Sequence, residues 1–98
     1  MKDNYNFIKY RMITVTDDWH PCFSNNQVRV SLSMFNISNR HYCLLNAWGA
    51  DDFGVEKSFL CCSKEENTAK FVELEKEYNA IPDVASKDWF FENGFKVC

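Results

Sequence analysis

The chain has 98 residues and a formal net charge of −3 at pH 7, with 46% hydrophobic and 26% charged residues. These proportions are typical of a folded globular protein and exclude a disordered or low-complexity chain. A chain of this length has room for one hydrophobic core, so we expect a single domain spanning residues 1–98.

The sequence predicts a cytoplasmic protein with reduced thiols. No stretch approaches the roughly 20 apolar residues of a bilayer-spanning helix, and residues 1–6 lack the apolar run of a signal peptide. The number of cysteines is odd and their spacing is irregular, which argues against a secreted disulfide scaffold. The five cysteines are Cys22, Cys43, Cys61, Cys62 and Cys98.

The first two thirds of the chain are typical of β-structure. The clearest strand pattern runs from Val28 to Met34, where every second residue is apolar and the residues between are polar. Segments rich in β-branched and aromatic residues predict three more strands. Short turns join the last three strands, so neighbours are expected to pair antiparallel. The predicted strands are residues 7–15, 27–35, 41–48 and 55–60.

The last third predicts helix. Ser63 and Glu66 form a capping box, and apolar residues then recur from Phe71 to Ile81 at steps of three and four. Pro82 ends this helix, and Ser86 caps a short second one. We therefore expect an α+β fold, a four-stranded antiparallel sheet covered on one face by a C-terminal helix, plus the short second helix.

Two chemistries have partial sequence support. Two His-x-Cys pairs offer the ligand types of a tetrahedral zinc site, although zinc pairs are usually separated by two to four residues. The adjacent Cys61 and Cys62 precede a helix N-terminus, where the helix dipole favours a thiolate. A small zinc-binding or thiol-dependent domain is therefore one alternative. Its residues would be His20, Cys22, His41 and Cys43.

The remaining chemistry-bearing patterns favour a protein that is not an enzyme and needs no cofactor. The sequence contains no phosphate-binding glycine loop, nucleophile elbow or His-Glu-x-x-His motif. The acidic pairs at 17–18 and 51–52 fall in predicted turns, where aspartates commonly accept backbone hydrogen bonds. A general acid would need burial to raise its pKa, and turns are exposed to water.

Charge and aromatic content indicate a protein-binding surface. Residues 41–98 carry eleven acidic and six basic side chains, which disfavours nonspecific binding to nucleic acid and fits a partner with a basic surface. Six aromatic residues lie in or beside predicted loops and the short second helix, more than the rim of a small core readily hides. They are Trp19, Phe23, Phe53, Trp89, Phe90 and Phe91. The predicted partner-binding residues are Asp51, Asp52, Phe53, Glu56, Glu73 and Glu77.

Part of the sequence resembles WGR domains. Ala47-Trp48-Gly49, a strand reaching Phe59 and a helix containing Phe71 resemble the strand–turn–strand–helix core of that family. The arginine that follows Trp-Gly in the family is replaced by Ala50, and the likeness covers less than half of the chain. DNA binding is therefore not carried over from this resemblance.

In size, layout and acidity the whole chain resembles small phage-encoded proteins that disable bacterial defences, anti-CRISPR proteins among them. The resemblance implies a non-enzymatic inhibitor that docks on a larger host protein or ribonucleoprotein complex in the cytoplasm of a bacterial host. This is the leading interpretation of the sequence. A structural subunit or a homodimer, with its aromatic residues used in self-association, is the other alternative.

Overall fold

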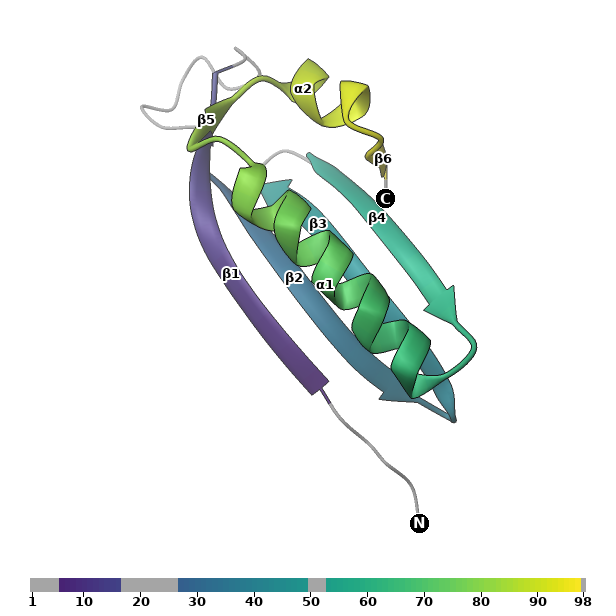
Figure 1. Cartoon of the computed structure of the whole chain (residues 1–98). Helices are drawn as coiled ribbons and strands as arrows, with labels where there is room; N and C mark the ends of the chain where they lie inside the picture. Colours follow the sequence, from purple (N-terminus) through teal and green to yellow (C-terminus); the bar gives the residue numbers. More distant parts are fainter. Residues whose placement is uncertain (1–5, 17–26, 50–52, 98) are drawn as a thin grey trace.

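The computed structural model describes residues 6–16, 27–49 and 53–97. It contains six strands and two helices within this part of the chain (Figure 1). In chain order they are β1 (Asn6–Val15), β2 (Gln27–Ile37), β3 (Arg40–Gly49), β4 (Gly54–Cys61), α1 (Lys64–Ala80), β5 (Val84–Ala85), α2 (Lys87–Glu92) and β6 (Lys96–Val97).

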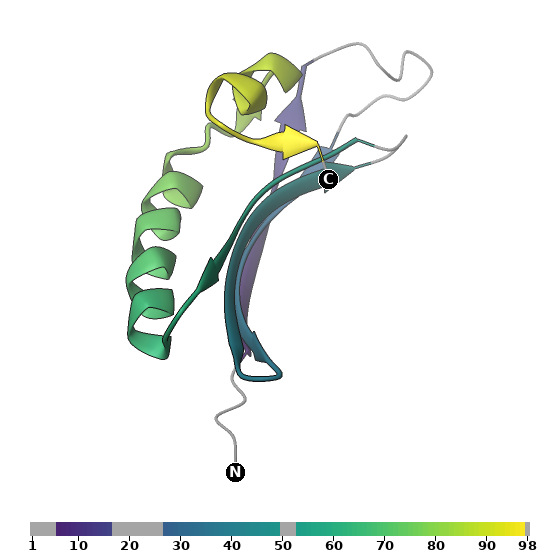
Figure 2. The ribbon, with the colours of Figure 1, turned by 90° about the vertical axis from the view of Figure 1, so that its right-hand side faces the viewer.

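All six strands belong to one sheet, in the order β5-β1-β2-β3-β4-β6. The four long strands pair antiparallel with their neighbours, β6 pairs antiparallel with β4, and β5 pairs parallel with β1. The result is one mixed sheet that curls into a half-barrel, with α1 lying along one side of it (Figure 2).

The predicted four-stranded antiparallel sheet is therefore wrong, because β5 and β6 add a strand at each edge. Both additions are two residues long, too short to show the alternation from which a strand is recognised. The parallel pairing arises because the chain crosses over through α1 and returns beside β1. The four long strands and the two helices do lie close to their predicted positions.

α1 begins at the predicted capping box. The Ser63 hydroxyl accepts a hydrogen bond from the Glu66 N–H at 3.1 Å, and the Glu66 carboxylate accepts one from the Cys62 N–H. The buried side of α1 then meets the apolar face of the central strands. Its buried residues are Asn67, Phe71, Leu74 and Tyr78.

α2 closes one end of the core with an aromatic cluster. The Phe90 side chain is fully buried, and its ring lies edge-on to those of Trp89 and Phe95, each at a centroid distance of 5.2 Å. The Phe53 ring is 5.9 Å away. Phe90 is thus a core residue, while Phe91 on the other side of α2 is 46% exposed. The predicted loop aromatics at positions 19 and 23 lie outside the described residues.

The β2–β3 turn and the outer edge of β1 have distinctive backbone features. The β2–β3 hairpin turns through Ser38 and Asn39, which both have positive φ (52° and 64°), the conformation of a two-residue primed turn. At the opposite edge, β5 pairs only with Thr14 and Val15, and the Thr14 N–H donates to the Asp83 carbonyl. The rest of β1 has no strand on that side among the described residues.

Candidate protein-binding face

The strand register determines which side chains lie on the sheet face opposite α1, named here the open face. It comprises even-numbered residues of β1, β3 and β4 and odd-numbered residues of β2. Four rows of paired positions cross it: Asn6–Phe35–Tyr42–Leu60, Ile8–Ser33–Leu44–Ser58, Tyr10–Ser31–Asn46–Glu56 and Met12–Arg29–Trp48–Gly54. In both views of the ribbon, no described helix lies over this face (Figures 1 and 2).

Large apolar and aromatic side chains of the open face are exposed. Ile8, Leu60 and Tyr10 are 64%, 61% and 59% exposed, although residues of these types are normally buried in large part. Their neighbours on the face extend the patch across all four long strands, which is typical of an interaction surface. The other large members are Met12, Phe35, Ile37, Tyr42, Leu44 and Trp48.

Arginine and aromatic contacts organise the patch. The Arg29 guanidinium lies 4.7 Å from the centroid of the Tyr10 ring and 5.6 Å from that of the Trp48 ring. Both are cation–π distances, so Arg29 links β1 to β3 across β2. Further along, the Phe35 and Tyr42 rings stack at 5.2 Å. Arginine and aromatic residues in such arrangements are typical of binding hot spots.

Small side chains also lie on the open face. Ser31 is only 7% exposed although it points away from α1, because larger side chains stand on both sides of it. Ser33 lies two residues along on the same face of β2, and Gly54 and Ser58 lie on β4.

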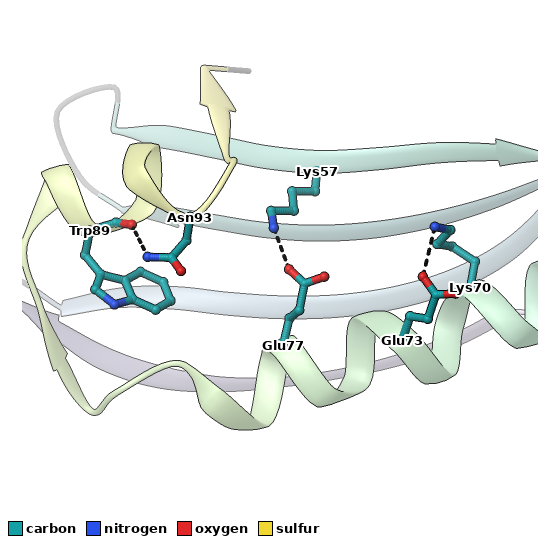
Figure 3. A network of polar contacts seen from close by, with 6 residues as sticks. All are labelled: Lys57, Lys70, Glu73, Glu77, Trp89 and Asn93. Carbon is teal, nitrogen blue, oxygen red and sulfur yellow. Dashed lines mark hydrogen bonds and ion pairs between the residues drawn. The ribbon is translucent and has the colours of Figure 1, made fainter.

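The open face is weakly basic, and the acidic residues of α1 lie on the other side of the sheet. The charged residues of the four long strands on this face are Arg29, Arg40 and Glu56, and Lys96 of β6, which pairs with Glu56, adds a third basic group. On the α1 side, Glu73 pairs with Lys70 at 3.0 Å and Glu77 pairs with Lys57 (Figure 3). These carboxylates are partly compensated within the chain.

The structure divides the predicted partner-binding residues between two faces. Glu56 is half-buried on the open face, whereas Glu73 and Glu77 extend from α1 on the opposite side (Figure 3). Phe53 is half-buried and packs against the core. The two aspartates, Asp51 and Asp52, lie outside the described residues.

Sequence reasoning missed the largest members of the open face. Ile8, Tyr10 and Trp48 lie inside predicted strands and are not among the predicted partner-binding residues. The available signal was that residues 7–15 and 41–48 are apolar at both odd and even positions. A strand of that kind needs a cover on each face, and the described chain supplies only one helix layer.

His41 and Cys43, the two described residues of the predicted zinc or thiol site, make ordinary hydrogen bonds within the fold. His41 and Cys43 share the α1 side of β3, where the His41 Nδ1 lies 3.2 Å from the Asn36 amide nitrogen. The Cys43 thiol donates to the Asn67 carbonyl and accepts from the Asn67 amide, both at 3.2 Å. Burial, with a smaller contribution from neighbouring Cys61, raises the pKa of Cys43 to about 11. This thiol is therefore protonated at neutral pH.

The remaining cysteines and histidine of the predicted zinc or thiol site do not form a metal site among the described residues. Cys61 is buried and Cys62 exposed, as expected for adjacent residues leaving a strand, and both are free thiols. Among the described residues, no three histidine, cysteine or acidic side chains gather closely enough to hold a metal ion. His20 and Cys22 lie outside the described residues.

No protein-family model, curated protein or solved structure matches the chain. The resemblances to WGR domains and to anti-CRISPR proteins therefore stay predictions. In the described part of the chain, no helix combines the length and apolar character needed to cross a membrane. The open face is consequently the feature on which a functional proposal rests.

Proposed function

We propose that the protein acts by binding another protein, without catalysis, and that the open face is its binding surface. The observation that carries this proposal is the exposure of large apolar side chains over four neighbouring strands, led by Ile8, Tyr10 and Leu60. Removing such a patch from water contributes about 25 cal/mol per Å² of apolar area. A partner that covers the face therefore gains most of its binding energy there.

The charge of the whole chain favours a protein partner over a nucleic acid. Aromatic rings beside an arginine are also typical of surfaces that stack unpaired bases. Nucleic-acid affinity, however, depends strongly on an excess of basic groups that neutralise phosphates. The open face has Arg29, Arg40 and Lys96 against Glu56, but the whole chain has a net charge of −3.

The more specific form of the proposal is an inhibitor of the anti-defence type, docking on a host nucleic-acid-handling complex. In that form the acidic residues, Glu73 and Glu77 among them, make a second contact with a basic surface of the target. Both are on α1, so they are available when the open face is covered. Partial pairing with Lys70 and Lys57 reduces the charge that they present.

Affinity capture from nuclease-treated bacterial lysate tests the function and the surface together. The tagged wild type is compared with Tyr10→Ser and Trp48→Ser, which remove exposed rings from the open face. Val72→Ser is the matched control, because Val72 is 47% exposed on α1, away from this face. A protein recovered in fixed ratio by wild type and control, and lost with both ring variants, supports the proposal.

Equal recovery by all four proteins removes the open face as the binding surface. Glu73→Lys and Glu77→Lys, run in parallel, examine the acidic contact separately. Loss of the partner with these two substitutions alone would move the binding surface to α1.

A further inference from the structure

We propose that the outer edge of β4 binds an extended peptide of another protein, which adds to the sheet as a further strand beside Ser58 and Leu60. Two observations carry this inference: backbone groups of β4 that face the edge without a described strand to pair with, and a cleft at the same place. The site differs from the open face, because its main contacts are backbone hydrogen bonds in the plane of the sheet.

The β3–β4 hairpin determines which backbone groups of β4 face the edge. The Gly49 N–H donates to the Phe53 carbonyl at 3.0 Å, so these opposed residues form a hydrogen-bonded pair. Such pairs alternate along an antiparallel ladder, so the odd-numbered residues of β4 bond to β3. The even-numbered residues then point their N–H and C=O groups away from β3, and Glu56 pairs with Lys96 of β6 on that side.

β6 covers only the first part of this edge. It pairs with Val55 and Glu56, and further along β4 no described strand lies next to it (Figure 1). Ser58 and Leu60, both exposed, therefore each direct one N–H and one C=O group to the outer edge. An added antiparallel strand exchanges two hydrogen bonds with each of these residues, which is how peptides bind other exposed sheet edges.

A cleft of about 460 Å³ lies at this position. It is lined by residues 56–59 of β4 together with Gly94, Lys96 and Val97. Ligand sites usually have volumes of about 300–1,000 Å³. An extended tripeptide is about 10 Å long, which matches the length of β4 from Ser58 to Leu60. The cleft is therefore large enough for the strand that the backbone groups require.

The charges around the cleft favour a neutral peptide over a free anion. The Lys57 ammonium pairs with the Glu77 carboxylate, and the Lys57 side chain is only 16% exposed. Lys96 lies directly opposite Glu56 in the β4–β6 pair, where opposite charges interact favourably. Each lysine of the cleft thus has a carboxylate beside it, so neither is set apart for a phosphate.

The side chains of β4 indicate what the peptide carries. Phe59, on the α1 side, is partly buried against the core. Leu60, on the open face, is 61% exposed. Side chains directly opposite each other on neighbouring strands interact, and apolar pairs with aromatic or β-branched members are favourable. The expected ligand therefore has two consecutive apolar residues, one beside Phe59 and the next beside Leu60 on the other face.

Selection of a phage-displayed library of linear peptides on the immobilised full chain provides the probe. We expect it to enrich peptides with two consecutive apolar residues. Synthetic copies are then titrated by fluorescence polarisation against the wild type, Ser58→Pro and Ser58→Ala. Proline removes the outward N–H but no bond to β3, so it is tolerated at this edge position, and circular dichroism checks the fold. Ser58→Pro should weaken binding about tenfold or more, whereas Ser58→Ala keeps the N–H and should bind like the wild type.

N-methylation of the selected peptide gives a second test, which needs no protein variant. Only every second N–H of a strand donates to a given neighbour. Methylation should therefore weaken binding at alternate peptide residues and be tolerated at those between. A library that yields no specific peptide overturns the inference. So does a folded Ser58→Pro variant that binds like the wild type, or equal losses at successive methylated residues.

The edge site and the open face can be told apart. Tyr10 lies on β1, and Trp48 pairs with Gly54 at the opposite end of β4 from Leu60. Tyr10→Ser and Trp48→Ser should therefore leave binding of the peptide unchanged. If these two substitutions abolish peptide binding and Ser58→Pro does not, the peptide binds the open face and only the edge inference falls. If only Ser58→Pro abolishes it, the edge site stands whatever the open-face variants capture from lysate.

Discussion

Replacement of Phe90 by alanine should remove a large part of the stability of the fold. Phe90 is fully buried in α2, and three aromatic rings surround it at centroid distances of 5.2 to 5.9 Å. Truncating a buried phenylalanine costs about 3–5 kcal/mol, because transfer free energy is lost and a cavity remains. The lost edge-to-face contacts, each worth about 0.5–1.5 kcal/mol, place this site toward the upper end of that range.

Urea denaturation at 25 °C measures the effect. A domain of this length is stable by about 5–15 kcal/mol, so a loss of about 4 kcal/mol leaves Phe90→Ala marginal. With a slope of about 2 kcal/mol per molar urea, the midpoint should fall by about 2 M. Phe91→Ala is the control, because Phe91 lies next in α2 but is 46% exposed. Its midpoint should change by less than about 0.5 M.

Similar urea midpoints for Phe90→Ala and Phe91→Ala would refute this prediction, since they would show that the burial of Phe90 does not stabilise the fold. A change in the denaturant slope of Phe90→Ala alone would have a different meaning. It would indicate that α2 and β6 detach before the rest of the chain unfolds.

Three further changes have expected outcomes. Ser38→Gly should stabilise the protein by up to about 1 kcal/mol in urea melts, because glycine adopts the positive φ of the β2–β3 turn without a steric cost; destabilisation would contradict this. Ser63→Ala should cost about 1 kcal/mol by removing the acceptor for the Glu66 N–H, and an unchanged midpoint would show that the cap is dispensable. Burial raises the pKa of Cys43 from 9.0 to about 11, so stability from this group is complete below pH 9 and falls as pH rises toward 11. The difference in unfolding free energy between wild type and Cys43→Ala should therefore shrink over that interval, by at most about 1.4 kcal/mol per pH unit, and a constant difference would argue against a raised pKa.

The long elements were predictable because their signals are local. The capping residues of α1 and the alternation in β2 depend on neighbours in the chain, and both patterns appear in the structure where they were expected. β5 and β6 depend instead on a register set by the whole sheet. A two-residue strand is too short to show an alternation of apolar and polar residues. The sequence around Val84 and Lys96 therefore could not predict β5, the parallel strand, or β6.

The candidate site was less predictable than the fold, for a related reason. Charged residues stand out in a sequence, so reasoning settled on Glu73 and Glu77, which the structure places in ion pairs with lysines. Exposed apolar residues do not stand out, because Tyr10 and Trp48 look like core residues until the pairing of strands shows which face α1 covers. Strand pairing and the position of α1 must be known before a buried sheet face can be distinguished from an exposed one.

Within the described residues, only Thr14 and Val15 of β1 pair with a strand on the side away from β2, and this has a consequence for the behaviour of concentrated solutions. The backbone groups of Ile8, Tyr10 and Met12 point away from β2, as the donation from Thr14 to Asp83 shows for the same side of the strand. A row of free donors and acceptors is a template for edge-to-edge polymerisation. Antiparallel pairing of two such edges would bring Lys9 and Arg11 of one molecule against those of the next. That repulsion comes mainly from Arg11, because Glu75 pairs with Lys9 at 2.7 Å. High salt, which screens the repulsion, should promote fibrous aggregation that low salt prevents.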